Sequence, residues 1–357
     1  MKNAPVILVL DAGGTNLVFT AAKNGTVIGK PVILPAESDN LETFLQKLIN
    51  GFETVNAQSG NKAQAISFAF PGPADYENGI IGDLQNLPFF RGGIPLKRIL
   101  ENHFKIPVFI NNDGDLFTLG EALGGILPEI NAQSEKQYKN LLGVTLGTGF
   151  GGGIVIDGKL LTGDNSASGE INRMSNLLNR NQSVEEVLSK RGIKRLFAEH
   201  AGISFEHTPE PFDIYNIAIE KQEGNKKAAI AAWDIFAEVL ADAIANAVTL
   251  TDSNVVIGGG LAGAHPLFLQ KTVNLLNGQL LTAEQNKIQR LEVYAYNWHN
   301  QQCRSDFLKT EYSEIRVPLS NETIRWSAEK KITIAISKLG TSEAVALGAY
   351  NFATEQL

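Results

Sequence analysis

A pattern of three strand-like segments, joined first by a Gly-Thr turn and then by an Asx-Gly turn, occurs twice in the chain. The Gly-Thr pairs occupy residues 14–15 and 147–148, which are 133 positions apart, and the Asx-Gly pairs occupy residues 24–25 and 157–158, separated by the same interval. Asx-Gly between apolar segments is a strong hairpin signal. A repeat kept in register predicts two similar α/β domains, and we expect their glycine-rich hairpins to face each other.

The second copy contains the stretch LGTGFGGGIVIDG, residues 146–158, which matches two nucleotide fingerprints in part. Its first glycines satisfy G-x-G-x-x-G, and residues 153–159 satisfy the P-loop spacing until Leu160 stands where Ser or Thr is needed. Both fingerprints require the glycines to open a helix, whereas here one strand leads into the glycines and another leads out. We therefore reject both. Glycines still let backbone N–H groups approach phosphate oxygens, so two such loops could hold a polyphosphate.

Composition limits the possible partners. A chain of 357 residues with 43% apolar residues is long enough for two domains with sizeable cores. A net charge of −7 and the lack of a dense basic cluster argue against nucleic acid as a partner. Cys303 is the only cysteine, which excludes an internal disulfide and a thiolate metal cage. No apolar run approaches the roughly 18 residues of a membrane span, so we expect a cytoplasmic protein with small-molecule partners.

Hydrophobic patterns give a coarse order of elements. A capping box at residues 39–42 predicts the start of a helix, and an apolar stripe of helical spacing, Trp233 to Ile244, predicts core packing. Residues 272–331 show no assignable pattern, whereas the alternation at residues 331–336 suggests a strand. Further strands are predicted at residues 6–10, 17–22, 26–28, 65–70, 107–110, 141–144 and 153–156.

Several motifs, in order along the chain, resemble a known family. Residues 11–15, 146–153 and 257–260 look like the phosphate-1, phosphate-2 and adenosine loops of the actin-like ATPase superfamily. Within it the chain is similar to ROK-family sugar kinases. That likeness is carried by Pro71-Gly72-Pro73, Asn86-Leu87-Pro88, Asn112-Asp113 with Leu119-Gly120-Glu121, Gly169-Glu170-Ile171, and Leu339-Gly340 with Leu347-Gly348-Ala349.

The resemblance implies an α/β fold of two actin-like (ribonuclease H-like) domains, each with a mixed sheet flanked by helices, and an interdomain cleft. We expect an N-terminal domain over residues 1–113 and a larger C-terminal domain over residues 114–335. Residues 336–357 are expected to form a helix that returns to the N-terminal domain. The family commonly dimerises, so a homodimer is a further expectation.

Two carboxylates receive roles from the resemblance. Asp113 follows a predicted strand on a polar loop, and the family gives this residue the general-base role. The alternative is a helix N-cap, although Asp115 could serve as the cap instead. Asp11 ends the first strand beside a phosphate loop, where a carboxylate would repel phosphate unless Mg²⁺ lies between them. In the family this residue positions the hydrated Mg²⁺. A plain Asx-turn role for Asp11 is the alternative.

The resemblance also assigns contacts to both substrates. ATP is expected at Asp11, Gly13, Gly14, Thr15, Gly147, Thr148, Gly149, Gly258, Gly259 and Gly260. The sugar is expected at Gly72, Asn86, Asn112, Glu170, Glu185 and Arg173, since amides and carboxylates can match sugar hydroxyls. Asn86, Asn112 and Glu170 could instead be turn or capping residues. Glu185 could equally lie on a solvated helix face.

Arg173 departs from the family pattern. ROK kinases usually place a His at this position, followed by a cysteine run, and together these hold structural Zn²⁺. Arg173 cannot bind zinc and no cysteine lies nearby, so we expect no zinc site. A guanidinium only donates hydrogen bonds, which leaves substrate identity open, and Arg173 could also turn outward.

The combined prediction is an ATP- and Mg²⁺-dependent kinase for a hexose or N-acetylhexosamine hydroxyl, with Asp113 as the base. Two alternatives stay open. The first is a catalytically silent sugar or nucleotide sensor. The second is a sugar-responsive regulator, which would need a DNA-binding domain for which we expect no room before the first strand.

Overall fold

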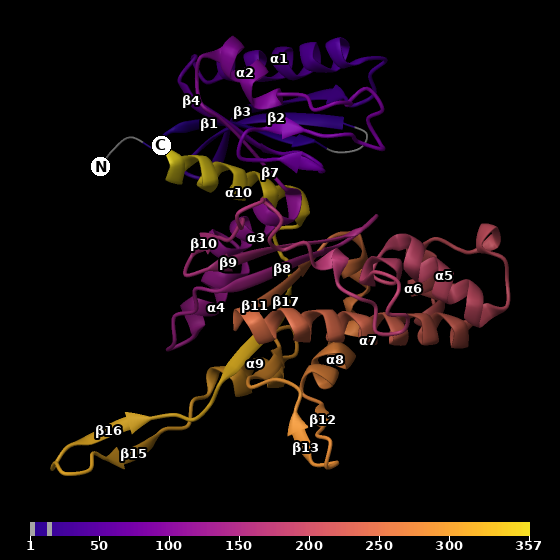
Figure 1. The fold of residues 1–357 in the computed structure, drawn as a ribbon, viewed down its shortest axis with the longest axis vertical. Helices are drawn as coiled ribbons and strands as arrows, with labels where there is room; N and C mark the ends of the chain where they lie inside the picture. The colour runs from indigo at the N-terminus through magenta and orange to yellow at the C-terminus, as the bar shows by residue number, and fades with distance from the viewer. Residues whose placement is uncertain (1–3, 13–15) are drawn as a thin grey trace. The chain divides into compact units, whose positions relative to one another are not determined.

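The computed structural model describes residues 4–12 and 16–357 of the chain (Figure 1). The chain divides into two compact units. The first comprises Met1–Gly125, Gly153–Gly169 and Leu339–Leu357, and the second comprises Ile126–Gly152 and Glu170–Lys338. This division differs from the expected boundaries, because the chain first leaves unit one after residue 125 and comes back to it for residues 153–169.

The first unit is built on a five-stranded mixed sheet with the strand order β3-β2-β1-β4-β7. Neighbours β1, β4 and β7 run parallel, whereas β2 is antiparallel to both β1 and β3. The carboxyl ends of β1, β4 and β7 therefore meet at one edge of the sheet. The strand bounds are β1 (Val6–Ala12), β2 (Asn16–Lys23), β3 (Thr26–Pro35), β4 (Ala63–Ala69) and β7 (Val108–Asn111).

Helices cover both faces of this sheet (Figure 1). Helices α1 (Leu41–Gln58) and α2 (Leu96–Phe104) lie on one face, and α10 (Thr341–Gln356) lies on the other. Asn40 caps α1 by accepting a hydrogen bond from the Thr43 N–H at 2.9 Å, as the capping signal predicts. Phe52 on α1 packs edge-on against Phe19 of the sheet, with ring centroids 5.0 Å apart. Both rings are fully buried, so this face forms the apolar core of the unit.

The remaining elements of the first unit are short, apart from α3. They are β5 (Ala74–Asp75), β6 (Ile80–Ile81), α3 (Asp113–Leu123), the end of β9 (Phe150–Ile156) and β10 (Lys159–Leu160).

The two Asx-Gly turns have the conformation that the repeat predicts. Asn24 and Gly25 have φ angles of 53° and 70°, and Asp157 and Gly158 have 51° and 78°. Positive φ at both central residues defines the type I′ turn, whose twist suits a two-residue hairpin. The first turn joins β2 to β3 and the second joins β9 to β10, so the hairpin prediction is confirmed at both places.

Two glycines let α3 and α10 pack backbone to backbone. A Cβ atom at Gly120 would lie 1.9 Å from the Ala344 carbonyl oxygen, and one at Gly348 would lie 1.9 Å from the Leu116 carbonyl oxygen. No larger residue fits at such distances. Both glycines belong to motifs that carried the family resemblance, and the structure gives them a packing role that fixes the helix beginning at Asp113.

The second unit has a sheet in which the strands follow the order β9-β8-β11-β17-β14, with β9 running on into the first unit. Strands β8 (Leu141–Leu146), β11 (Asn254–Gly258), β17 (Lys331–Ile336) and β14 (Tyr294–Asn297) are parallel neighbours. The long helix α7 (Lys226–Thr251) carries the predicted apolar stripe. Its members are at most 1% exposed, which confirms their place in the core: Trp233, Phe236, Val239, Leu240 and Ile244.

The other elements of this unit are helical segments around the sheet. They are α4 (Ile126–Gln133), η1 (Ile171–Arg173), η2 (Val184–Glu186), α5 (Lys190–Ala201), η3 (Phe205–His207), α6 (Pro211–Ala218), η4 (Gly260–Ala264), α8 (His265–Leu276) and α9 (Gln301–Leu308). Among the described residues, no helix is both long enough and apolar enough to cross a membrane.

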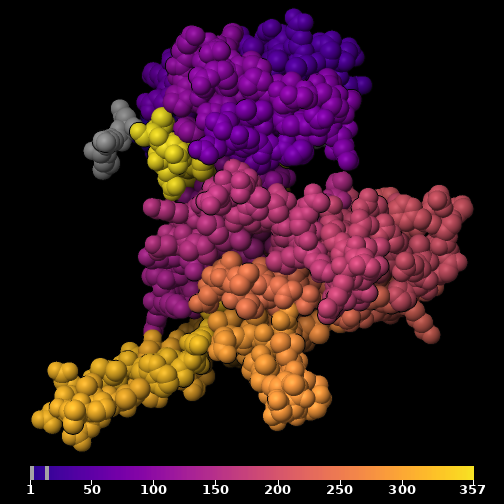
Figure 2. All heavy atoms as spheres, in the orientation of Figure 1, coloured from indigo at the N-terminus to yellow at the C-terminus, as the bar shows by residue number. Residues whose placement is uncertain are grey.

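The segment without a sequence pattern contains two hairpins on either side of β14 and α9. The first joins β12 (Gln279–Leu281) to β13 (Lys287–Gln289), and the second joins β15 (Ser313–Arg316) to β16 (Thr323–Trp326). Figure 2 shows the second hairpin as an arm that extends from the rest of this unit. Every residue of these four strands is exposed, so no buried face imposes the alternation that would have revealed them in the sequence.

The α3–α10 contact gives a test of the fold. Because the added methyl would overlap a backbone carbonyl, we expect Gly348→Ala to lower the free energy of unfolding by about 1–3 kcal/mol or more. Gly263→Ala is the control, since a Cβ atom there meets nothing within 4 Å. Denaturant unfolding of the two variants measures the difference, and equal stabilities would contradict the proposed packing role.

Candidate functional site

The first unit gathers polar residues at the edge where its parallel strands end. Asp11 lies near the end of β1, Gly72 follows β4, and Asn112 and Asp113 follow β7. The parallel order β1-β4-β7 brings these positions to the same edge of the sheet. Such an edge is the usual place for a ligand site in an α/β protein.

Asp113 is the first residue of α3, and its carboxylate remains accessible to solvent. Its Oδ1 accepts a hydrogen bond from the Gly114 N–H at 2.9 Å. The surrounding protein desolvates the carboxyl and raises its pKa above the ordinary 3.8, and the hydrogen bond from Gly114 opposes this shift only in part. An accessible carboxylate with a raised pKa is suited to accept a proton.

Asn112 provides the N-cap of α3, so neither Asp113 nor Asp115, the two candidates for this role, is the capping residue. The Asn112 side-chain oxygen accepts from the Gly114 N–H at 2.7 Å. Asp115 lies inside the first turn of the helix and is only 5% exposed. The Gly114 N–H is thus shared between the Asn112 and Asp113 side chains, and of the two Asp113 carboxylate oxygens only Oδ1 accepts it.

Asp11 is half-buried at the end of β1, in a position from which a carboxylate could face a metal ion. The other expected residues of this loop, Gly13, Gly14 and Thr15, lie outside the described residues. Among those that are described, no three His, Cys, Asp or Glu side chains gather as metal ligands. A magnesium ion held at Asp11 would therefore take most of its ligands from phosphate oxygens and water, which is how Mg²⁺ is commonly held.

The remaining residues expected at the sugar lie on exposed segments. In the first unit Gly72 and Asn86 are exposed on the loops after β4 and β6. In the second unit Glu170 precedes η1 and Arg173 ends it, and both are exposed. The Arg173 backbone N–H donates to the Glu170 carbonyl oxygen at 3.0 Å, and the guanidinium makes no hydrogen bond or ion pair with the described residues.

Glu185 does not lie on a solvated helix face. It is half-buried in η2, and its Oε2 accepts a hydrogen bond from the Phe150 N–H at 2.9 Å. Phe150 follows Gly149, so the carboxylate contacts the loop that resembles phosphate-2. Sequence reasoning placed Glu185 at the sugar and missed this contact, because only folding brings η2 and the loop together.

The phosphate-2 and adenosine loops lie side by side within the second unit. Strands β8 and β11 pair in parallel, and each ends in one of the loops. Gly259 has φ +87°, and a Cβ atom there would lie 2.3 Å from the Leu146 carbonyl oxygen. Only glycine satisfies both constraints. The structure thus brings Gly147, Thr148 and Gly149 close to Gly258, Gly259 and Gly260.

A cavity of about 310 Å³ opens beside the adenosine loop. Gly260, Leu261 and Gly263 form one side of it, and Phe212, Tyr215 and Trp233 contribute aromatic surface. Trp233 is 1% exposed, and its Nε1–H has no hydrogen-bond partner among the described residues. An apolar cavity with a few polar groups, next to glycine-rich loops, suits a nucleobase.

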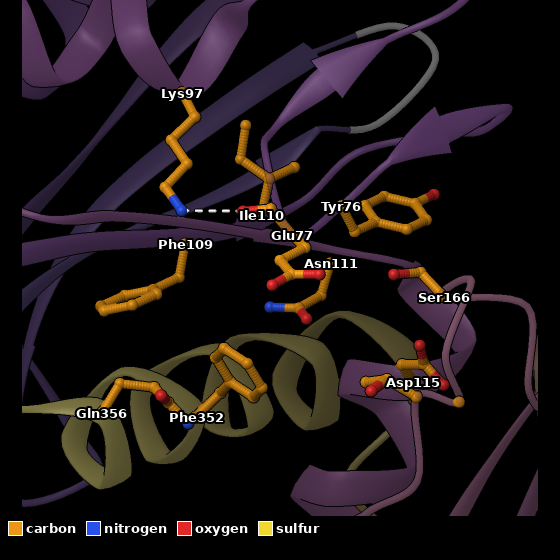
Figure 3. A pocket seen from close by; sticks show the side chains of 12 residues that line it. Tyr76, Glu77, Lys97, Phe109, Ile110, Asn111, Asp115, Ser166, Phe352 and Gln356 are labelled. Atoms are coloured by element: carbon orange, nitrogen blue, oxygen red, sulfur yellow. Dashed lines mark hydrogen bonds between the residues drawn. The ribbon is translucent and has the colours of Figure 1, made fainter.

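Figure 3 shows a second cavity, of about 240 Å³, which lies within the first unit and which the sequence did not reveal. Phe109 of β7 and Phe352 of α10 form its apolar side, with ring centroids 5.9 Å apart. The Lys97 ammonium donates to the Glu77 carbonyl oxygen at 2.8 Å. Asn111 is 4% exposed, and its side-chain N–H₂ has no partner among the described residues. Neither Asn112 nor Asp113 lines this cavity.

The fold and the loops define the class of the protein. Two α/β units, one with a carboxylate at the ends of parallel strands and the other with adjoining glycine loops beside a cavity, are the architecture of the actin-like ATPase superfamily. That architecture is the one the motifs led us to expect, and the model of the ROK family matches residues 7–302, so the chain belongs to the ROK family.

Relatives with known structures or names support the assignment. A glucokinase of known structure from Parabacteroides distasonis is 44% identical, with a TM-score of 0.89 over 100% of this chain and 99% of that one. An N-acetyl-D-glucosamine kinase from Vibrio parahaemolyticus is 30% identical over 270 residues, which are 71% of this chain and 83% of the relative. A glucokinase from Halalkalibacterium halodurans is 29% identical over 287 residues, 73% and 82% of the two chains.

The cavity beside Gly260 can be tested by filling it. A Cβ atom at Gly260 meets nothing within 4 Å, so Gly260→Ile should fold normally while its side chain occupies the cavity. We expect ADP to bind at least about tenfold more weakly, which corresponds to about 1.4 kcal/mol. Calorimetric titration with ADP measures the change and thermal unfolding checks the fold. Unchanged affinity would place the nucleobase elsewhere.

Proposed function

We propose that this protein transfers the γ-phosphoryl group of ATP to a hydroxyl of a hexose or N-acetylhexosamine, with Asp113 as the general base. The observation that carries the proposal is Asp113 itself. It is an accessible carboxylate with a raised pKa, at the edge where the parallel strands end. Membership of the ROK family and likeness to a glucokinase and an N-acetyl-D-glucosamine kinase support the choice of substrate class.

The chemistry assigned to Asp113 is a single proton transfer coupled to phosphoryl transfer. The sugar oxygen forms a bond to the γ-phosphorus while the bond from that phosphorus to the β,γ-bridging oxygen breaks, and its electron pair leaves with ADP. The hydroxyl proton passes to the Asp113 carboxylate. Because desolvation makes the carboxylate more basic than an exposed one, it accepts this proton more readily.

The nucleotide would be held mainly by the second unit. The loop at residues 147–149 would bind phosphate oxygens through the backbone N–H groups of Thr148 and Gly149, and the cavity beside Gly260 would take the base. Asp11 is the residue that would position Mg²⁺ from the first unit. When bound, this ion neutralises charge on the phosphate oxygens.

The sugar would contact residues from the exposed loops. Asn86, Asn112 and Gly72 would supply contacts from the first unit, and Glu170 and Glu185 from the second. Asn side chains both donate and accept, and carboxylates accept, so together they can match a ring of hydroxyl groups. Arg173, exposed and with no described partner for its guanidinium, would be free to reach a substituent that accepts hydrogen bonds.

Replacement of Asp113 should affect catalysis and stability in different directions. Asp113→Asn should reduce kcat by about 10²–10⁴-fold, the usual contribution of a general base. The same variant should be at least as stable as the wild type at pH 7. Folding raises the pKa of the Asp113 carboxyl, so the folded state disfavours the ionised form. At a pH above that pKa the ionised carboxylate therefore lowers the stability of the folded protein, and neutral Asn removes this cost.

The measurement is sugar-stimulated ADP release over glucose, mannose, fructose, N-acetylglucosamine and N-acetylmannosamine, together with thermal unfolding of both proteins. Equal ADP release by wild type and Asp113→Asn would remove Asp113 from the mechanism. An absence of release with any sugar would favour the sensor.

The raised pKa also predicts a pH profile. A base acts only when ionised, so kcat/KM should fall about tenfold per pH unit below the pKa of Asp113. Since desolvation raises that pKa, the acid limb should lie above the ordinary value of 3.8. Initial rates over a pH series on the free enzyme give the limb. A limb at or below 3.8 would contradict the desolvated environment.

A further inference from the structure

The segment around η2 holds the phosphate-2 loop at both of its ends. At one end the Glu185 carboxylate accepts from the Phe150 N–H at 2.9 Å. At the other end the Lys190 N–H donates to the Gly147 carbonyl oxygen, also at 2.9 Å. Inside the loop the Gly147 N–H donates to the Gly149 carbonyl oxygen. The curvature of residues 147–150 is therefore fixed from outside as well as from within.

The Glu185 carboxylate also lies close to Gly149. A Cβ atom on Gly149 would lie 2.5 Å from Oε2 of Glu185 and 3.3 Å from its Cδ. Gly149 does not have a positive φ, so backbone conformation alone does not require glycine there. A side chain at residue 149 would instead push the Glu185 carboxylate away from its place beside the Phe150 N–H. The absence of a side chain at residue 149 thus leaves room for the Glu185 carboxylate beside the loop.

The backbone around Glu185 is held in place by buried neighbours and by hydrogen bonds. Its neighbours Val184, Val187 and Leu188 are buried, and Ser189 caps α5 by accepting from the Gly192 N–H. The Val184 N–H donates to the Met174 carbonyl oxygen at 2.9 Å, which ties η2 to the segment that follows η1. Glu185 therefore connects the segment with Glu170 and Arg173 to the phosphate-2 loop.

The adjacent acidic residue has a different and separate partner. The Glu186 carboxylate binds Arg191 at 2.7 Å and Arg195 at 2.8 Å, both on α5, and these contacts lower its pKa. Two neighbouring carboxylates thus divide their roles. Glu186 forms ion pairs with α5, whereas Glu185 contacts the phosphate-2 loop. Glu186 is therefore a suitable control for Glu185.

We infer that Glu185 is a positioning residue for the nucleotide phosphates, acting through the phosphate-2 loop, in addition to any contact with the sugar. By accepting the Phe150 N–H it holds the loop in the shape that presents its other N–H groups to phosphate. The inference rests on the proposed kinase function and adds a link between the sugar side and the phosphate side of the same unit.

The role can be separated from sugar binding with two substitutions. Glu185→Gln keeps an oxygen that can accept the Phe150 N–H, whereas Glu185→Ala removes it. We expect Glu185→Ala to raise KM for ATP about tenfold, and Glu185→Gln to stay within about threefold of wild type, because the acceptor is retained. Glu186→Ala should lower the melting temperature and leave both KM values within about twofold.

Several outcomes would overturn the inference. If Glu185→Ala and Glu185→Gln both raise KM for the sugar and leave KM for ATP unchanged, Glu185 is a sugar ligand only. A lower KM for ATP in Glu185→Ala would mean that the carboxylate competes with phosphate for the loop. Equal effects of Glu185→Ala and Glu186→Ala would reduce Glu185 to a general structural role.

Direct binding of ADP keeps this test distinct from the proposed reaction. Calorimetric titration without sugar should show the same order of affinities, with Glu185→Ala weakest, even if no sugar supports turnover. The steric fit adds a second readout: Gly149→Ala should weaken ADP binding more in the wild type than in Glu185→Ala, where the clashing side chain is gone. Equal losses in the two backgrounds would show that residues 149 and 185 are not coupled.

Discussion

The nucleotide side of this protein depends on an approach of two backbones that only glycine permits. Parallel pairing of β8 and β11 brings their carboxyl ends together, and Gly259 then passes so close to Leu146 that no side chain fits between them. The two loops that follow become neighbours as a consequence. A cavity with aromatic walls opens beside Gly260, next to backbone N–H groups suited to phosphate. The second unit therefore offers a place for the base and a place for the phosphates of one nucleotide.

The first unit uses a comparable contact for a different purpose. Gly120 and Gly348 let α3 and α10 cross at backbone distance, and this crossing anchors the helix that begins with Asp113. Asn112 satisfies the Gly114 N–H, one of the free N–H groups in the first turn of that helix. A carboxylate held in this way keeps its position while its surroundings raise its pKa. The packing of two helices thereby supports the protonation chemistry proposed for a single side chain.

The sequence was sufficient wherever local chemistry decides the structure. The Asx-Gly turns, the cap at Asn40 and the apolar stripe of α7 were all predicted, because each depends on neighbouring residues. Contacts between distant segments were not. The contact of Glu185 with Phe150 joins residues 35 positions apart, and no spacing rule reports it. Asn111 and Asn112 are identical neighbours, yet one faces a cavity and the other caps a helix. Asp115, a possible cap in the sequence, lies inside the first turn because the helix already begins at Asp113.

Two of the residues with a buried, unpartnered polar atom belong to cavity walls. Trp233, whose Nε1–H has no partner among the described residues, lines the cavity beside the adenosine loop, and Asn111, whose amide N–H₂ has none, lines the cavity of the first unit. An unsatisfied buried donor costs about 1–3 kcal/mol, which is a sizeable part of the net stability of a domain. A core residue could avoid this cost by being apolar. At a cavity, however, a ligand or an ordered water can supply the missing acceptor, and the free energy is recovered on binding. The same reasoning applies to Asp113, whose desolvated carboxylate opposes folding while it improves the base. At Trp233 and Asp113, groups whose burial is unfavourable for folding therefore lie where the proposed chemistry would use them.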